Sequence, residues 1–230
     1  MRKTGKLLWM GIIVSTWMGG GMVQAAGPER VLIIGDSMMR VAAHATTLAL
    51  DKRPGVTTKS QTSLGSGLAR LDAYDWMSKI DELVRTFNPD VSVVWFGTND
   101  RQPMQTENGI VNITDPEWEA EYARRVGMVM DKLTTAKGAE VYWLELPVMR
   151  DDNITESVDI INSIAKAEAD KREDVTFFIT RNILGRKPGV YSPNIIGPTG
   201  KMIVLRSSDG VHLSRPGADR IADALDKELY

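Results

Sequence analysis

The sequence contains no cysteine, and histidine occurs only at His44 and His212. Without cysteine the chain can form neither a disulfide nor a thiolate nucleophile, so its stability has to come from its core alone. Two isolated histidines do not form a cluster of ligands with the spacing of a zinc site. The sequence therefore predicts no metal site, and cysteine chemistry is excluded.

Positive charge is not in excess either. The chain has 28 Lys and Arg residues against 30 Asp and Glu residues, a formal net charge of −2 at pH 7. Proteins that bind nucleic acid through its backbone usually carry a surplus of basic residues. We therefore expect no nucleic-acid partner.

The one long apolar stretch lies at the N-terminus, where Arg2, Lys3 and Lys6 precede a run from Leu7 to about Val23. A basic segment, an apolar segment and small residues such as Ala25, in that order, form the pattern of a secretory signal peptide. We expect residues 1–25 to be removed, which leaves a periplasmic or secreted protein with no stable membrane insertion. The alternative is a segment kept as a membrane anchor, because its length is near the minimum for crossing a bilayer.

The remaining residues, 26–230, are predicted to form one domain. A composition of 43% apolar and 25% charged residues is typical of a globular chain with a single core. Removal of residues 1–25 takes away three basic residues and no acidic ones, which leaves 25 basic against 30 acidic residues and a net charge of −5.

Short continuous apolar runs recur along the chain and predict buried strands. Residues that are apolar on both faces of a strand suit a parallel sheet that helices cover on both sides. The runs are Val31–Ile34, Val91–Phe96, Val141–Leu146 and Val175–Ile179, with a weaker one at Val56–Lys59.

Between these runs, apolar residues recur at helical spacing in residues 76–87, 118–133, 160–165 and 218–229. The alternation predicts an α/β fold of three layers, in which a doubly wound sheet of about five parallel strands lies between two layers of helices. In such folds ligands bind beyond the carboxyl ends of the strands. Residues 181–208 break the alternation, and a Gly-Pro-Thr-Gly turn at 197–200 predicts a hairpin beside the site.

Ser37 follows the first predicted strand in the sequence Gly35-Asp36-Ser37. A serine at this place would stand at the mouth of the sheet and near the start of the next helix, which is the exposure that a nucleophile needs. The same tripeptide is also a common helix cap, so it does not by itself establish catalysis.

Asp209 and His212 lie three residues apart, just before the last predicted helix. This spacing lets the two side chains converge in one turn, so that the carboxylate orients the imidazole and the imidazole accepts the serine proton. The alternative is a capping aspartate beside a surface histidine. His44, on the helix after Ser37, is expected to be a packed or surface histidine rather than a second base.

Two further polar blocks follow strands at the same edge. Asn99, in Gly97-Thr98-Asn99-Asp100, could donate its side-chain amide to an oxyanion, although Gly, Asn and Asp are also ordinary turn residues. Gly65 and Gly67 follow the weak second strand and could bring a backbone N–H close to a substrate.

These four blocks, in this order along the chain, resemble those of the SGNH, or GDSL-like, hydrolase family, and in particular an envelope branch of it. The resemblance covers Val31 to about Leu229 and implies a flavodoxin-like fold and catalysis without a cofactor. It also implies the roles of the residues. Ser37 would be nucleophile and first oxyanion donor, Gly65 (or Gly67) the second donor and Asn99 the third, with Asp209 and His212 completing a catalytic triad.

Taken with export, the resemblance implies a serine esterase that hydrolyses a carbon–oxygen ester through an acyl-enzyme on Ser37. The expected partner is an acylated carbohydrate or another small ester, with an O-acyl group on an envelope or extracellular glycan as the leading possibility. The first alternative is an acyltransferase that passes the acyl group to a glycan hydroxyl. The second is a non-catalytic glycan-binding or assembly module. Arg150, Arg206 and Tyr191 are further candidates for substrate contact.

Overall fold

The computed structural model describes residues 29–187 and 189–230, so the expected signal segment, residues 1–25, lies outside the described residues. Its centre is one parallel sheet with the strand order β2-β1-β3-β6-β7, which is the flavodoxin-like doubly wound order. All five strands lie where the apolar runs predict them, within a few residues. They are β1 (Arg30–Gly35), β2 (Thr57–Thr62), β3 (Val91–Trp95), β6 (Glu140–Leu144) and β7 (Val175–Phe178).

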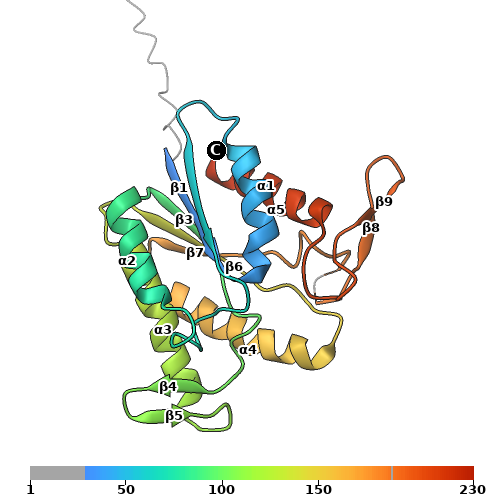
Figure 1. The fold of residues 1–230 in the computed structure, drawn as a ribbon. Coiled ribbons are helices and arrows are strands. Elements are labelled where there is room, and N and C mark those ends of the chain that lie inside the picture. The colour runs from blue at the N-terminus through green and yellow to red at the C-terminus, as the bar shows by residue number, and fades with distance from the viewer. Residues whose placement is uncertain (1–28, 188) are drawn as a thin grey trace, which may run out of the picture.

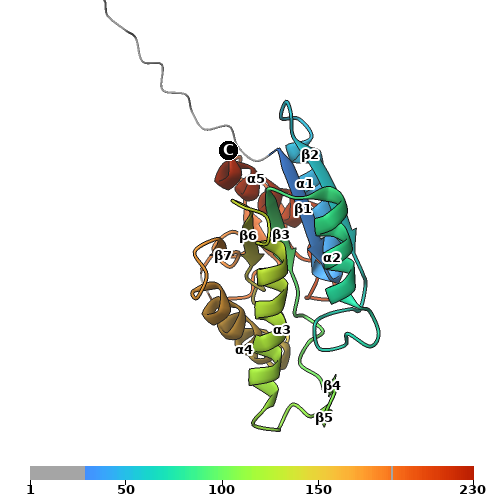
Figure 2. The ribbon, with the colours of Figure 1, turned by 90° about the vertical axis from the view of Figure 1, so that its left-hand side faces the viewer.

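Helices cover both faces of this sheet, which confirms the predicted three layers. Helices α1 and α5 pack against each other on one face, and α2, α3 and α4 lie on the other (Figures 1 and 2). None of the helices in the described part of the chain is long and apolar enough to cross a membrane. Their bounds are α1 (Ser37–Leu50), α2 (Trp76–Phe87), α3 (Trp118–Leu133), α4 (Asp152–Ala169) and α5 (Arg215–Leu229).

The core lies on both faces of strands β1 and β3. Every residue of β3 is buried, and in β1 only Arg30 is not. The tryptophans at positions 76, 95, 118 and 143 are each at most 1% exposed, as their places in the strand and helix patterns predict. A rigid, fully packed sheet of this kind holds the ends of its strands in fixed positions.

Two antiparallel hairpins begin beyond the carboxyl ends of β3 and β7 (Figure 1). The second, β8 (Asn194–Ile196) and β9 (Met202–Val204), confirms the hairpin predicted within residues 181–208. The first, β4 (Met104–Thr106) and β5 (Gly109–Val111), is not predicted by the sequence, because three-residue strands are too short to show alternation.

Candidate active site

Ser37 is the first residue of α1 and follows β1 with only Asp36 between them. The side chain of Asp36 caps the helix by accepting the Met38 N–H at 2.8 Å. Gly35 makes the close approach possible, because a Cβ there would lie 2.2 Å from the carbonyl oxygen of Trp95 on the neighbouring strand. The half-buried Ser37 is thus held at the carboxyl edge of the sheet.

The loop before α5 brings His212 to Ser37. The Nε2 atom of His212 lies 2.9 Å from the Ser37 Oγ, and its Nδ1 atom lies 2.8 Å from Oδ2 of Asp209. An ionised carboxylate can only accept hydrogen bonds, so Nδ1 carries the imidazole proton and Nε2 is left to accept from the serine hydroxyl. The three side chains that the sequence analysis singled out therefore form one continuous hydrogen-bonded chain.

Asp209 is held in its ionised form by its own loop. Partial burial alone would raise the pKa of Asp209, but hydrogen bonds from the His212 side chain and from the N–H groups of Val211 and His212 lower it to about 2. Those two N–H groups reach Oδ1 at 2.8 Å and 3.0 Å, which leaves Oδ2 for the imidazole. The carboxylate is thus negative and fixed at any neutral pH.

Two arginines hold the backbone of this loop in place through hydrogen bonds to its carbonyl oxygens. Arg150 donates to the carbonyl oxygens of Ser208 and Asp209, both at 2.8 Å. Arg206 is 4% exposed and donates to the carbonyl oxygens of Val211 at 2.6 Å and Val148 at 2.7 Å. The sequence offered both arginines as substrate contacts, whereas in the structure their guanidinium groups bond to the backbone that carries Asp209 and His212.

Asn99 follows β3 and faces the glycine loop that follows β2. Its Nδ2 donates to the carbonyl oxygen of Ser66 at 3.1 Å, so the amide lies against the loop that contains Gly65 and Gly67. A side-chain amide has two N–H donors, and this bond uses one of them. The second N–H is available to a ligand.

The buried carboxylates of Asp36 and Asp100 connect the loops that follow different strands. Oδ2 of Asp36 accepts the N–H of Gly97 at 3.1 Å, and Asp100 accepts the N–H of Ala69 at 2.9 Å and the hydroxyl of Tyr122 at 2.7 Å. Burial raises the pKa of Asp36 to about 7, against the opposing effect of its backbone donors, and burial likewise raises the pKa of Asp100. Each carboxylate ties two separate blocks together.

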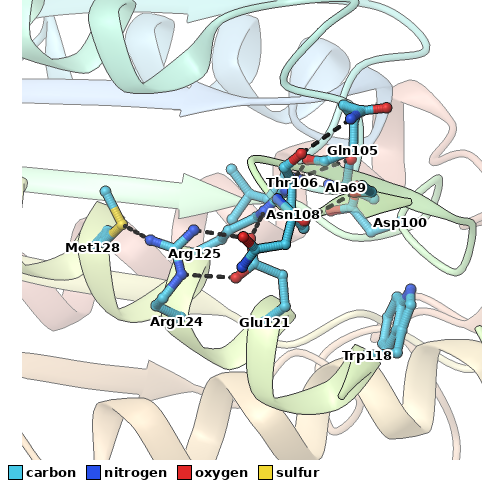
Figure 3. A network of polar contacts seen from close by, with 12 residues as sticks. Ala69, Asp100, Gln105, Thr106, Asn108, Trp118, Glu121, Arg124, Arg125 and Met128 are labelled. Carbon is cyan, nitrogen blue, oxygen red and sulfur yellow. Dashed lines mark hydrogen bonds and ion pairs between the residues drawn. The ribbon is translucent and has the colours of Figure 1, made fainter. Parts of the chain in front are cut away.

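Arg125, on α3, reinforces the same loop from the other side (Figure 3). It is 3% exposed and donates to the carbonyl oxygens of Leu68 and Ala69 at 2.8 Å and 2.9 Å, while its Nε donates to Glu121 at 2.7 Å. Hydrogen bonds from a charged donor to carbonyl oxygens are stronger than those between neutral groups. The glycine loop is therefore rigidly placed.

The two glycines of this loop differ in their surroundings, and this gives a testable prediction. A Cβ on the buried Gly67 would lie 1.9 Å from Oδ1 of Asp100, whereas a Cβ on the exposed Gly65 would meet nothing within 4 Å, although Gly65 has a φ of +65°. We expect Gly67→Ala to lower the free energy of unfolding by about 3 kcal/mol through overpacking. Gly65→Ala should cost only about 1 kcal/mol, from the left-handed backbone. Equal losses in denaturant unfolding would contradict this assignment of the contact.

Several residues of the site were not predicted from the sequence. Asp36 and Asp100 belong to the motifs Gly35-Asp36-Ser37 and Gly97-Thr98-Asn99-Asp100, but the spacing of these motifs does not show that both carboxylates bond to other loops. Arg125 did leave a signal. It lies three residues after Tyr122 and four before Val129, on the apolar stripe of its helix, where a charged residue needs a buried partner.

The parallel sheet, the serine after its first strand and the Asp209–His212 loop before its last helix give the chain the fold of the SGNH hydrolases. The family model described as "Protein of unknown function (DUF459)" matches residues 30–228, and the chain belongs to that family. A comparison with curated proteins finds no match.

Solved structures with the same fold include known enzymes. A catalytic mutant of an acetylxylan esterase from Geobacillus stearothermophilus has a TM-score of 0.58 and 16% identity, over 87% of this chain and 93% of the other. A candidate SGNH hydrolase from Slackia heliotrinireducens gives 0.56 and 14%, over 86% and 97%. The C-terminal catalytic domain of peptidoglycan O-acetyltransferase A from Streptococcus pneumoniae gives 0.51 and 17%, over 88% and 93%. At these identities the likeness concerns the fold.

Proposed function

We propose that this protein is an exported serine esterase that hydrolyses a carbon–oxygen ester through an acyl-enzyme on Ser37. The observation that carries the proposal is the pair of hydrogen bonds that joins Ser37 to His212 at 2.9 Å and His212 to Asp209 at 2.8 Å. A capping aspartate and a surface histidine would have no reason to align with a serine 175 residues away in the chain. The complete chain of hydrogen bonds from Ser37 to Asp209 also argues against a non-catalytic binding module.

In the proposed reaction, Ser37 Oγ attacks the ester carbonyl carbon while its proton passes to Nε2 of His212. The imidazolium then returns this proton to the leaving alkoxide oxygen as the carbon–oxygen bond breaks, and an acyl-enzyme remains. Water attacks the acyl carbon while His212 accepts its proton. The imidazolium then returns this proton to Ser37 Oγ as the bond between Oγ and the acyl carbon breaks, and the carboxylic acid leaves. Asp209 stays ionised throughout and stabilises the imidazolium.

The oxyanion that forms in each attack needs donors that are already in place. The N–H of Ser37 at the start of α1, the N–H of Gly65 (or Gly67) and the second amide N–H of Asn99 are the proposed donors. Because the loop and the amide are fixed to each other through the Ser66 carbonyl oxygen, the donors require little reorganisation when the charge develops.

The proposed substrate is an O-acyl group on an envelope or extracellular glycan. Removal of the predicted signal peptide would leave the protein outside the cytoplasm, and proteins of the same fold include an acetylxylan esterase and a peptidoglycan O-acetyltransferase. Hydrolysis is favoured over transfer to a sugar hydroxyl by the open site, since the side chains of His212 and Asp209 are 37% and 48% exposed. Water can reach an acyl-enzyme beside such a base.

Asn99→Ala tests the oxyanion role. The amide would act mainly in the transition state, so we expect kcat to fall by about 10²- to 10³-fold with a much smaller change in KM. Labelling of Ser37 by a fluorophosphonate should persist at a slower rate, because the nucleophile and base remain paired. A rise in KM alone, or a large drop in Tm, would make Asn99 a substrate contact or a structural residue instead.

The activity itself is tested by a screen of short-chain aryl esters and acetylated glycans with the purified protein. We expect release of the acid from aryl acetates and from at least one acetylated glycan, and none with Ser37→Ala. Mass spectrometry with an unacetylated oligosaccharide added separates hydrolysis from transfer, since transfer would acetylate the added sugar. A folded protein that releases no acid and transfers no acyl group would contradict the proposal.

A further inference from the structure

The segment between β7 and the loop that carries Asp209 and His212, which we call the histidine loop, has an excess of positive charge. Residues 175–208 contain five basic residues and no acidic one, in a chain whose net charge is −2. Of the five, Arg181 is paired with Glu145 and Asp159, which belong to other parts of the chain. The other four form no salt bridge among the described residues, although Arg206 lies close enough to Asp209 to interact with its charge. They are Arg186, Lys187, Lys201 and Arg206.

Two of these cations lie at a groove. Arg186 and Lys187 are exposed and line a groove of about 460 Å³, together with Tyr191 and Asn194. The backbone of Arg186 is fixed by the buried Ser192, whose Oγ accepts the Arg186 N–H at 3.3 Å. The groove therefore combines two unpaired positive charges with an aromatic side chain.

The side chain of Arg206 connects the groove with the histidine loop. The guanidinium carbon of Arg206 lies 5.3 Å from the centre of the Tyr191 ring, and the same guanidinium donates to the carbonyl oxygen of Val211, the residue before His212. The backbone is continuous as well, since the carbonyl oxygen of Pro193 accepts the N–H of Leu205 at 2.8 Å. The wall of the groove that contains Tyr191 is therefore linked to the backbone that carries His212, the proposed base.

We propose that this groove binds a carboxylate of the ester substrate, a conclusion that rests on the proposed esterase function. Adjacent Arg and Lys side chains give charge-assisted hydrogen bonds to a carboxylate, and the buried positive charge of Arg206 behind Tyr191 adds to the local potential. The carboxylate can belong to an acidic sugar of the glycan or to an acyl group derived from a dicarboxylic acid. In both cases the enzyme prefers a negatively charged ester over a matched neutral one.

The test compares charged and neutral esters in the full-length wild type and two variants. The acyl-carboxylate probe is the mono-aryl ester of adipic acid, and its neutral match is the aryl ester of hexanoic acid, which has the same chain length. The glycan probes are O-acetylated oligosaccharides of galacturonic acid and of galactose, and an aryl acetate measures the basal rate. The groove variant is Arg186→Glu/Lys187→Glu. The control is Lys201→Glu, which changes an exposed and unpaired cation of the same segment that does not line the groove.

For the wild type we expect kcat/KM to be at least about tenfold higher on one charged probe than on its neutral match. This preference should shrink as salt concentration rises. The groove variant should lose it while keeping the rate on aryl acetate within about twofold, and Lys201→Glu should retain it. A preference for the adipate ester places the carboxylate in the acyl group, and a preference for the galacturonate oligosaccharide places it in the glycan.

No charge preference in the wild type would overturn the proposal. An equal loss of the preference in Lys201→Glu would also overturn it, because the cause would then be the field of the whole segment rather than the groove. Failure of the esterase function is a separate result, since in that case aryl acetate would not be hydrolysed by the wild type either.

Discussion

Ser37→Ala should lower kcat for the hydrolysis of an aryl acetate by about 10⁶-fold, the usual cost of removing the nucleophile of a serine triad. The Oγ atom forms the bond to the acyl carbon, and no neighbouring side chain in the site can replace it. Its only hydrogen bond to another side chain in the described structure is the one to His212. The variant should therefore unfold within a few degrees of the wild-type Tm.

A matched control is Ser163→Ala, which removes an exposed hydroxyl from α4 that bonds only to the local helix backbone. This variant should keep the wild-type rate. A Ser37→Ala enzyme that retained a substantial fraction of its activity in freshly purified, folded protein would mean that the ester is attacked by another group.

His212→Ala should reduce kcat almost as strongly, by about 10⁴- to 10⁶-fold, because the serine hydroxyl loses the base that accepts its proton. His44→Ala is the natural comparison, since these are the only two histidines in the chain and His44 lies exposed on α1. We expect His44→Ala to retain most of the activity on aryl acetate.

The double variant Ser37→Ala/His212→Ala sharpens this test. Residues that act as one unit are strongly non-additive, so the double variant should be about as slow as the slower single variant. Multiplicative losses would show that the two side chains act in separate steps. Equal losses in His212→Ala and His44→Ala would mean that both histidines act or that the base is wrongly assigned.

Most of the fold follows from short-range patterns in the sequence. The run Val31–Ile34 is apolar at every position, which indicates a strand buried on both faces, and in the structure this strand lies between β2 and β3. The hairpin β4–β5 was missed because its formation depends on the turn at Thr106–Gly109, where the Thr106 hydroxyl donates to the Gly109 carbonyl oxygen. A local polar contact of this kind leaves no periodicity.

In the site, too, short-range patterns predict some features and leave others unpredicted. Ser37 and Asn99 follow parallel strands, so the rule for parallel sheets is enough to bring them to one edge. Asp209 and His212 lie in the loop before the last helix, and only their three-residue spacing indicates that the two side chains act together. The supporting contacts could not be predicted, because they connect residues far apart in the chain through backbone atoms. Arg125, for example, holds the glycine loop through carbonyl oxygens 56 and 57 residues away, and every residue type offers such an oxygen.

Covalent labelling identifies the nucleophile directly. The folded wild-type protein is treated with a fluorophosphonate, digested, and mapped by mass spectrometry. We expect a single adduct on Ser37, formed much more slowly in His212→Ala because the hydroxyl is no longer activated. An adduct on another residue, or no adduct in a protein that is folded by its thermal melt, would contradict the assignment of Ser37 as the nucleophile.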